Sequence, residues 1–199
     1  MDPNAILNRL VRLARLDTTL IDEDRDDQKE LVPAVVVTVI AAFLAGFGAF
    51  MWSKTVPEFD LEDAFLNQFI LGSLFMAAMY GVSVLIVYVV MAQVFKVQVD
   101  LQALARTMGY AALPLGASVL MFIPIVFPVF ALVPLALLFV MMVYAVQSAT
   151  GAESNQVVMS VTIAFCVMVL VLGLISGSAS GVKAPMGAGD FGIIFSFHS

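Results

Sequence analysis

Long apolar runs separated by short polar segments make up most of the chain. Each run is long enough to cross a bilayer, because a helix rises about 1.5 Å per residue and the hydrocarbon core is about 30 Å thick. The pattern predicts an all-α, polytopic integral membrane protein with five transmembrane helices. We expect the spans at about 31–53, 68–95, 106–123, 128–147 and 157–175.

The stretch 107–152 contains no Asp, Glu, Lys or Arg. It is about twice the length of one crossing, so we expect two spans joined by a tight turn. Proline removes a backbone donor and restricts the preceding residue, and Pro124 and Pro128 interrupt the helical pattern in quick succession. The turn is therefore predicted between them, and Pro114 is predicted to bend the third span.

The charged segment 1–30 begins with a predicted amphipathic helix and continues as an acidic linker. At about 100° per residue its leucine, isoleucine and valine side chains share one face, with Leu16 as the exception. Three arginines lie on the opposite face: Arg9, Arg12 and Arg15. A basic polar face suits the headgroup region of anionic lipid. Packing on the protein's own surface or on a partner is an equally good interpretation.

Small residues recur every fourth position in several spans. Such ridges let helix backbones approach closely in lipid, where there is little hydrophobic driving force between helices. We predict that they form helix-packing interfaces within or between molecules: Ala42, Gly46, Ala77, Gly81, Gly173 and Gly177. Polar side chains inside the spans are expected to form hydrogen bonds between helices.

After the five-helix domain, 31–176, the tail 177–199 begins rich in glycine and serine and ends apolar. Its apolar side chains are candidates for docking onto a neighbouring subunit: Phe191, Ile193, Ile194, Phe195 and Phe197. The alternative is that the tail folds back onto the ends of the spans.

Lysine and arginine are distributed unevenly over the polar segments. With five spans and a cytoplasmic N-terminus, seven of these cations lie inside and two outside: Arg9, Arg12, Arg15, Arg25, Lys29, Lys96 and Arg106 against Lys54 and Lys183. Because cytoplasmic loops carry the excess of these residues, we expect the N-terminus inside and the C-terminus outside.

The composition narrows the function. Charged residues make up 12% of the chain, about half of what soluble domains carry, and the net charge is −6. An acidic chain argues against nucleic-acid binding. One cysteine excludes a cysteine-based structural zinc site. We expect no metal, no cofactor and, since no catalytic motif is present, no enzymatic activity.

Ion-coupled transporters place ionisable side chains near the middle of the membrane, and the predicted spans have none there. A small-solute permease or channel is therefore a lower-ranked alternative. A channel built from backbone carbonyls of proline-broken helices in an oligomer stays open as an interpretation.

The run Arg-Thr-Met-Gly-Tyr-Ala-Ala-Leu-Pro contains Gly109, Tyr110 and Pro114. It resembles the opening of the third span in the membrane domain of the Ypt-interacting protein (Yip) family, and the resemblance covers about 31–175. It implies a tight hairpin, a fifth crossing, a cytoplasmic N-terminus and an outward C-terminus. Eukaryotic members associate with Rab-type GTPases and with each other, so a GTPase contact is implied by the resemblance alone. The short segment before the first span is more similar to a prokaryotic-type member, in the cytoplasmic membrane.

These observations favour a non-enzymatic membrane scaffold or adaptor. Its expected partners are membrane lipid and other integral membrane proteins or further copies of itself. The main alternative is an accessory subunit of a large energy-converting complex, respiratory or photosynthetic, in which the N-terminal helix and the apolar tail would be docking elements.

Overall fold

The computed structural model describes residues 12, 25, 27–54, 61–123 and 125–178, and these residues form helices and short connections without a strand. Helical elements that follow one another in nearly one direction are called a rod. The first rod consists of η1 (Gln28–Glu30) and α3 (Leu31–Ser53). The second is α4 (Leu61–Ala64), the π-helix η2 (Phe65–Leu71), α5 (Gly72–Val89) and the π-helix η3 (Val90–Val94). The third is α6 (Leu101–Ala111) and the 3-10 helix η4 (Leu113–Phe122). The last two are α7 (Phe127–Thr150) and α8 (Ser154–Ser178).

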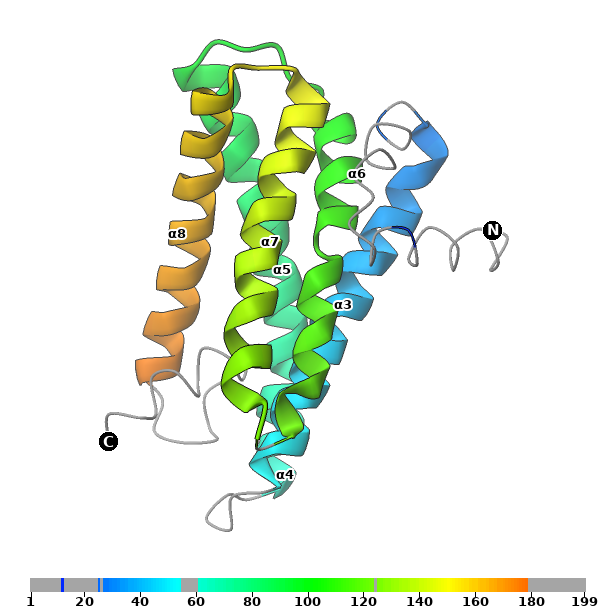
Figure 1. The fold of residues 1–199 in the computed structure, drawn as a ribbon, viewed down its shortest axis with the longest axis vertical. Coiled ribbons are helices and arrows are strands. Elements are labelled where there is room, and N and C mark those ends of the chain that lie inside the picture. The colour runs from blue at the N-terminus through cyan, green and yellow to red at the C-terminus, as the bar shows by residue number, and fades with distance from the viewer. Residues whose placement is uncertain (1–11, 13–24, 26, 55–60, 124, 179–199) are drawn as a thin grey trace.

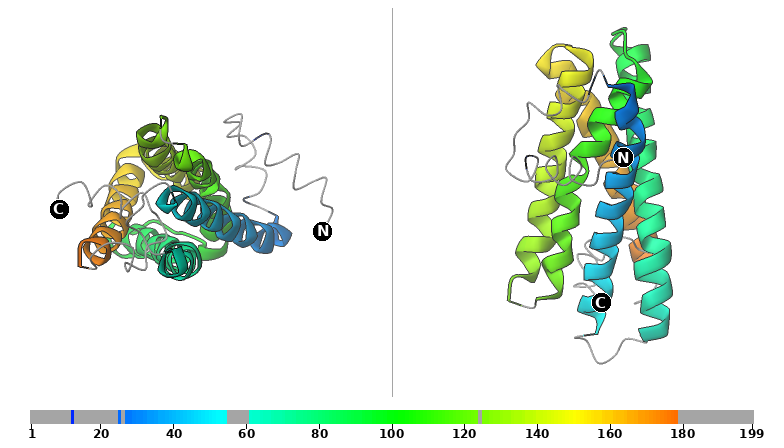
Figure 2. Two further views of the ribbon diagram at one scale, coloured as in Figure 1. Left: turned by 90° about the horizontal axis from the view of Figure 1, so that it is seen from below. Right: turned by 90° about the vertical axis from the view of Figure 1, so that its right-hand side faces the viewer.

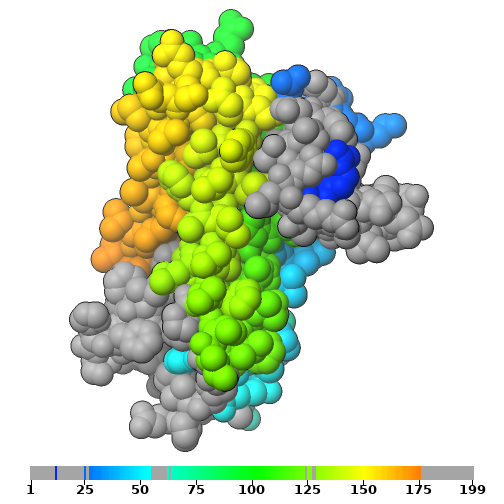
Figure 3. Space-filling model, in the orientation of Figure 1, coloured from blue at the N-terminus to red at the C-terminus, as the bar shows by residue number. Residues whose placement is uncertain are grey.

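The five rods run alternately up and down (Figure 1). We call the end at which α3, α6 and α8 begin the upper end, as in Figure 1, and the other the lower end. The rods form a ring in which α6–η4 packs between α3 and α7, α8 packs on α7 and α5, and α5 closes the ring on α3 (Figure 2). In the space-filling view, α7 and η4 lie in the middle of one face beside α8 (Figure 3).

The outer faces of the rods are apolar. Four helical stretches are long and apolar enough to cross a membrane: Gln28–Ser53, Phe65–Val94, Val129–Thr150 and Ser154–Ile175. The fifth rod, α6–η4, runs the length of the bundle between two of them (Figure 1). Large apolar side chains such as Leu170 and Leu174 point outward instead of into the core. This surface and the all-helical architecture confirm the prediction of a polytopic membrane protein.

Two helices begin earlier than hydropathy predicts. The second rod is already helical at Leu61, because Asn67 and Gln68 are accommodated in the π-helical turn η2 instead of ending the helix. The third begins at Leu101, where the carboxylate of Asp100 accepts hydrogen bonds from the first backbone N–H groups of α6. A hydrophobicity pattern does not register either effect.

Two predictions made from prolines concern the turn after the third rod and the change within that rod at Pro114. The chain turns between the end of η4 at Phe122 and the start of α7 at Phe127, which is where the turn was predicted. At Pro114 the rod changes from α-helix to 3-10 helix. Proline has no N–H and clashes with the carbonyl four residues earlier, which disfavours a continued α-helical ladder at Pro114, although α7 continues through Pro134.

Several predictions fall outside the described residues. Of the expected N-terminal amphipathic helix only Arg12 is described, while Arg9 and Arg15 are not. The apolar end of the tail also lies outside them: Phe191, Ile193, Ile194, Phe195 and Phe197.

Candidate functional site

The Gly-Tyr motif lies in α6 where this helix crosses the start of α3. A Cβ atom built on Gly109 would lie 2.7 Å from the Cβ of Ala34 and 2.9 Å from its carbonyl oxygen. Contacts this short do not occur for real Cβ atoms, so the two backbones are in contact because position 109 has no side chain. Gly109 is therefore a packing residue of the motif.

Hydrogen bonds hold the motif to two other rods. The hydroxyl of Thr38 in α3 donates to the carbonyl of Gly109 (3.1 Å). The buried hydroxyl of Tyr80 in α5 donates to the carbonyl of Met108 (2.6 Å). Both carbonyls lie in the last turn of α6, which ends at Ala111. Three rods therefore meet at this point through backbone groups of α6.

Tyr110 connects the motif to the upper end of the bundle. Its ring is buried, and its hydroxyl donates to a carboxylate oxygen of Glu30 in η1 at 2.5 Å. A hydrogen bond to a carboxylate is stronger than one between neutral groups. Tyr110 thereby anchors the turn that precedes α3.

The contact between α3 and α6–η4 continues downward from the motif as a seam of small residues. A Cβ on Gly116 would lie 3.7 Å from the Cα of Ala41, in ordinary contact. A Cβ on Gly48 would lie 2.5 Å from the carbonyl oxygen of Ser118. The α3 side of this seam is Ala34, Ala41 and Gly48, whose spacing of seven residues differs from the four-residue spacing of the predicted ridges.

The residues of the predicted ridges lie in different surroundings. Gly46 is buried, and a Cβ there would collide with the hydroxyl of Ser73 and approach the carbonyl oxygen of Gln68 at 3.1 Å. Gly81 is exposed, with nothing within 4 Å of its Cβ position. Of the others, Ala42 and Gly173 are buried, Ala77 is half-buried, and Gly177 lies in the last turn of α8.

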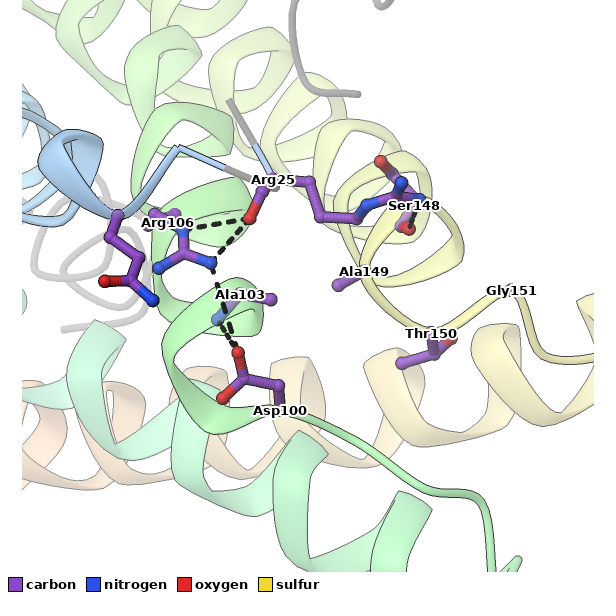
Figure 4. A pocket seen from close by; sticks show the side chains of 9 residues that line it. Arg25, Asp100, Ala103, Arg106, Ser148, Ala149, Thr150 and Gly151 are labelled. Carbon is purple, nitrogen blue, oxygen red and sulfur yellow. Dashed lines mark hydrogen bonds and ion pairs between the residues drawn. The ribbon is translucent and has the colours of Figure 1, made fainter. Parts of the chain in front are cut away.

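A polar pocket of about 470 Å³ opens at the upper end, one turn above the motif (Figure 4). It is lined by Arg25, Gln28, Asp100, Ala103, Arg106, Ser148, Ala149, Thr150 and Gly151. The lining comes from the residues before α3, the start of α6 and the end of α7. Gly151 adopts the left-handed conformation (φ 59°) that ends α7 at the pocket's edge.

Arg106 is the central side chain of the pocket, with only 3% of its surface exposed. Its Nε and Nη2 donate to the carbonyl oxygen of Arg25 at 3.0 and 2.5 Å. The nearest carboxylate oxygen, on Asp100, lies 4.0 Å from Nη2 and belongs to an exposed side chain. Its Nη1 is buried without a hydrogen-bond partner.

Arg25 spans the other side of the pocket, where its Nη1 donates to the carbonyl of Ser148 at 3.2 Å. Sequence reasoning used Arg25 and Arg106 only as orientation charges and missed the pocket. A usable signal was present, because Arg106 is the one charged residue in the sequence of α6. Among the described residues no group of His, Cys, Asp and Glu side chains could hold a metal ion.

Comparison with known proteins identifies the membrane domain as a whole. A family model described as the Yip1 domain matches residues 20–176, which include the motif, both arginines of the pocket and all five rods apart from the last two residues of α8. No curated protein and no solved structure matches the chain.

Proposed function

Because the chain belongs to the Yip1 domain family, we propose that it is a non-enzymatic scaffold or adaptor within the membrane. It would bind other integral membrane proteins or further copies of itself through helix–helix contacts. Proteins of this family are not known as enzymes, which agrees with the proposal.

The single observation that carries the proposal is the open position at Gly81. Its neighbours on the outer face of α5 include the exposed side chains of Leu74, Ala78 and Leu85. With no atom within 4 Å of its Cβ position, Gly81 leaves a notch between larger apolar side chains. Notches of this kind allow a second helix to approach closely in lipid, where packing drives association.

The buried glycines do not offer such a surface. Gly46, Gly48 and Gly109 are already covered by neighbouring backbone or side chains of the same molecule. Substitution there tests the fold of one molecule, while substitution at Gly81 tests what binds to its outside. This difference makes the proposal testable.

We expect Gly81→Leu to weaken assembly without lowering the thermal unfolding midpoint in detergent. The measurement is oligomer size by light scattering, together with the membrane proteins that co-purify after mild solubilisation. Val89→Leu is the matched control, because it enlarges another exposed apolar position of the same helix. If Gly81→Leu leaves both oligomer size and co-purifying partners unchanged, the scaffold proposal is wrong.

We further propose that the upper end faces the cytoplasm, in a prokaryotic cytoplasmic membrane. The excess of lysine and arginine in the segments at this end supports it. A reporter that is active only outside the cytoplasm, fused after Ser199, should be active. A cytoplasmic signal from the same fusion would reverse the orientation.

A further inference from the structure

We propose that the pocket at the upper end binds a phosphate group, with Arg106 and Arg25 as its cationic ligands. The proposal does not depend on the scaffold function. It assigns the pocket a ligand class, a phosphate carried by an anionic lipid headgroup or free in solution.

Arg106 is incompletely paired for a buried charge. A charge removed from water is costly unless it is paired and hydrogen-bonded. Arg106 is 3% exposed, yet its nearest carboxylate, on Asp100, is 4.0 Å away. Both oxygens of that carboxylate already accept hydrogen bonds from the backbone N–H groups of Gln102 and Ala103. Its capacity to neutralise Arg106 is therefore partly used.

The Nη1 of Arg106 is buried and has no hydrogen-bond partner. A guanidinium presents several N–H donors in one plane, which suits the oxygens of a phosphate. The Nε and Nη2 groups hold the plane in place through the carbonyl of Arg25. A fixed guanidinium with one buried donor to spare is prepared for an oxyanion.

Cationic side chains line the pocket from two segments of the chain. Among the lining residues that the structure describes, the charged ones are Arg25, Arg106 and Asp100. Figure 4 shows the two arginines on neighbouring elements, with Arg25 reaching across toward Ser148. An anion placed between them would be attracted by cations from two separate segments of the chain.

The position and volume of the pocket favour a whole lipid headgroup over a phosphate ion alone. The pocket lies near the start of α3 and the end of α7, and Val32 in the first turn of α3 is an outward-facing apolar side chain. We expect the ends of membrane-spanning helices to lie at the level of the lipid headgroups, where the phosphates are. A volume of about 470 Å³ falls within the usual range of small-molecule sites and exceeds what one phosphate needs.

The experiment measures the thermal unfolding midpoint of the full chain in a neutral detergent. Three additives are compared: short-chain phosphatidylglycerol, short-chain phosphatidylcholine and inorganic phosphate. Ligands that bind only the folded state raise the midpoint, by roughly 5 °C for a protein of this size at about 100 times the dissociation constant. We expect phosphatidylglycerol to give such a rise and phosphatidylcholine, whose headgroup is neutral overall, less than half of it.

Variants connect the rise to the pocket. Arg106→Gln and Arg25→Gln should each remove most of it. Lys29→Gln is the matched control, because it deletes the same charge at the same end from an exposed side chain outside the pocket lining. Ala149→Glu places a carboxylate in the lining and should abolish the response while leaving Arg106 intact, so the test holds even if Arg106→Gln does not fold.

The outcomes distinguish a phosphate on a lipid headgroup from a free phosphate ion. A rise with phosphatidylglycerol alone assigns the pocket to a lipid headgroup, and an equal rise with inorganic phosphate assigns it to a free anion. The absence of any rise would overturn the proposal. So would a rise that persists unchanged in both Arg25→Gln and Ala149→Glu.

Discussion

The seam between α3 and α6–η4 and the outer face of α5 use small residues in opposite ways. On the seam, Gly109 and Gly48 lie against the backbone of a neighbouring helix of the same molecule. On α5, Gly81 faces open space. In the sequence all three are glycines within long apolar runs. A small residue in a membrane helix allows close approach within the molecule only where it faces a neighbouring helix. The sequence alone does not show which way it faces.

The largest expected effect is at the seam. Gly109→Ala would place a Cβ 2.9 Å from the carbonyl oxygen of Ala34, and backbone cannot move aside as a side-chain tip can. We expect a loss of about 3 kcal/mol in the free energy of unfolding, at the upper range for overpacked cores. Equilibrium unfolding in mixed detergent measures it. A loss below 1 kcal/mol would show that the seam is loosely packed.

A middle effect is expected where α5 is tied to the motif. Tyr80→Phe removes the hydrogen bond to the carbonyl of Met108 and keeps the ring. We expect a loss of about 1 kcal/mol, because hydrogen bonds between membrane helices contribute modestly. The same unfolding measurement applies, with Tyr88→Phe on the same helix as control. Equal losses in the two variants would mean that the Met108 contact adds no stability.

The smallest effect, and one of opposite sign, is expected on the open face. Gly81→Ala adds a methyl group to open space and removes the backbone freedom that glycine has in the unfolded chain. We expect a gain of about 0.5–1 kcal/mol. A loss at this position would contradict the description of the outer face of α5 and the contrast with Gly109.

Much of the fold could be predicted because lipid restricts the choices. Backbone groups in hydrocarbon must be satisfied within the protein, so an apolar run of sufficient length becomes a helix. The hairpin between Phe122 and Phe127 could be predicted from its prolines, because proline interrupts helical hydrogen bonding. The Gly-Tyr motif could be located but not explained, since its partners Ala34, Thr38 and Tyr80 come from other rods.

The pocket could not be predicted at all. Arg25 and Arg106 are 81 positions apart, and the hydrogen bonds that join them use a backbone carbonyl that no sequence pattern marks. Their positive charges can be counted from the sequence, so both residues could be used to predict the orientation in the membrane. Their convergence on one site depends on how η1, α6 and α7 meet.

The sequence by itself determined that this protein is an all-helical, polytopic membrane protein, since long apolar runs and the cost of unpaired backbone in lipid favour helices that span the bilayer. Tertiary structure alone decided which glycines are enclosed and which face outward. It also decided that two distant arginines line one pocket. Both depend on the rotation of each helix about its own axis, which is set by packing against its neighbours and not by hydrophobicity.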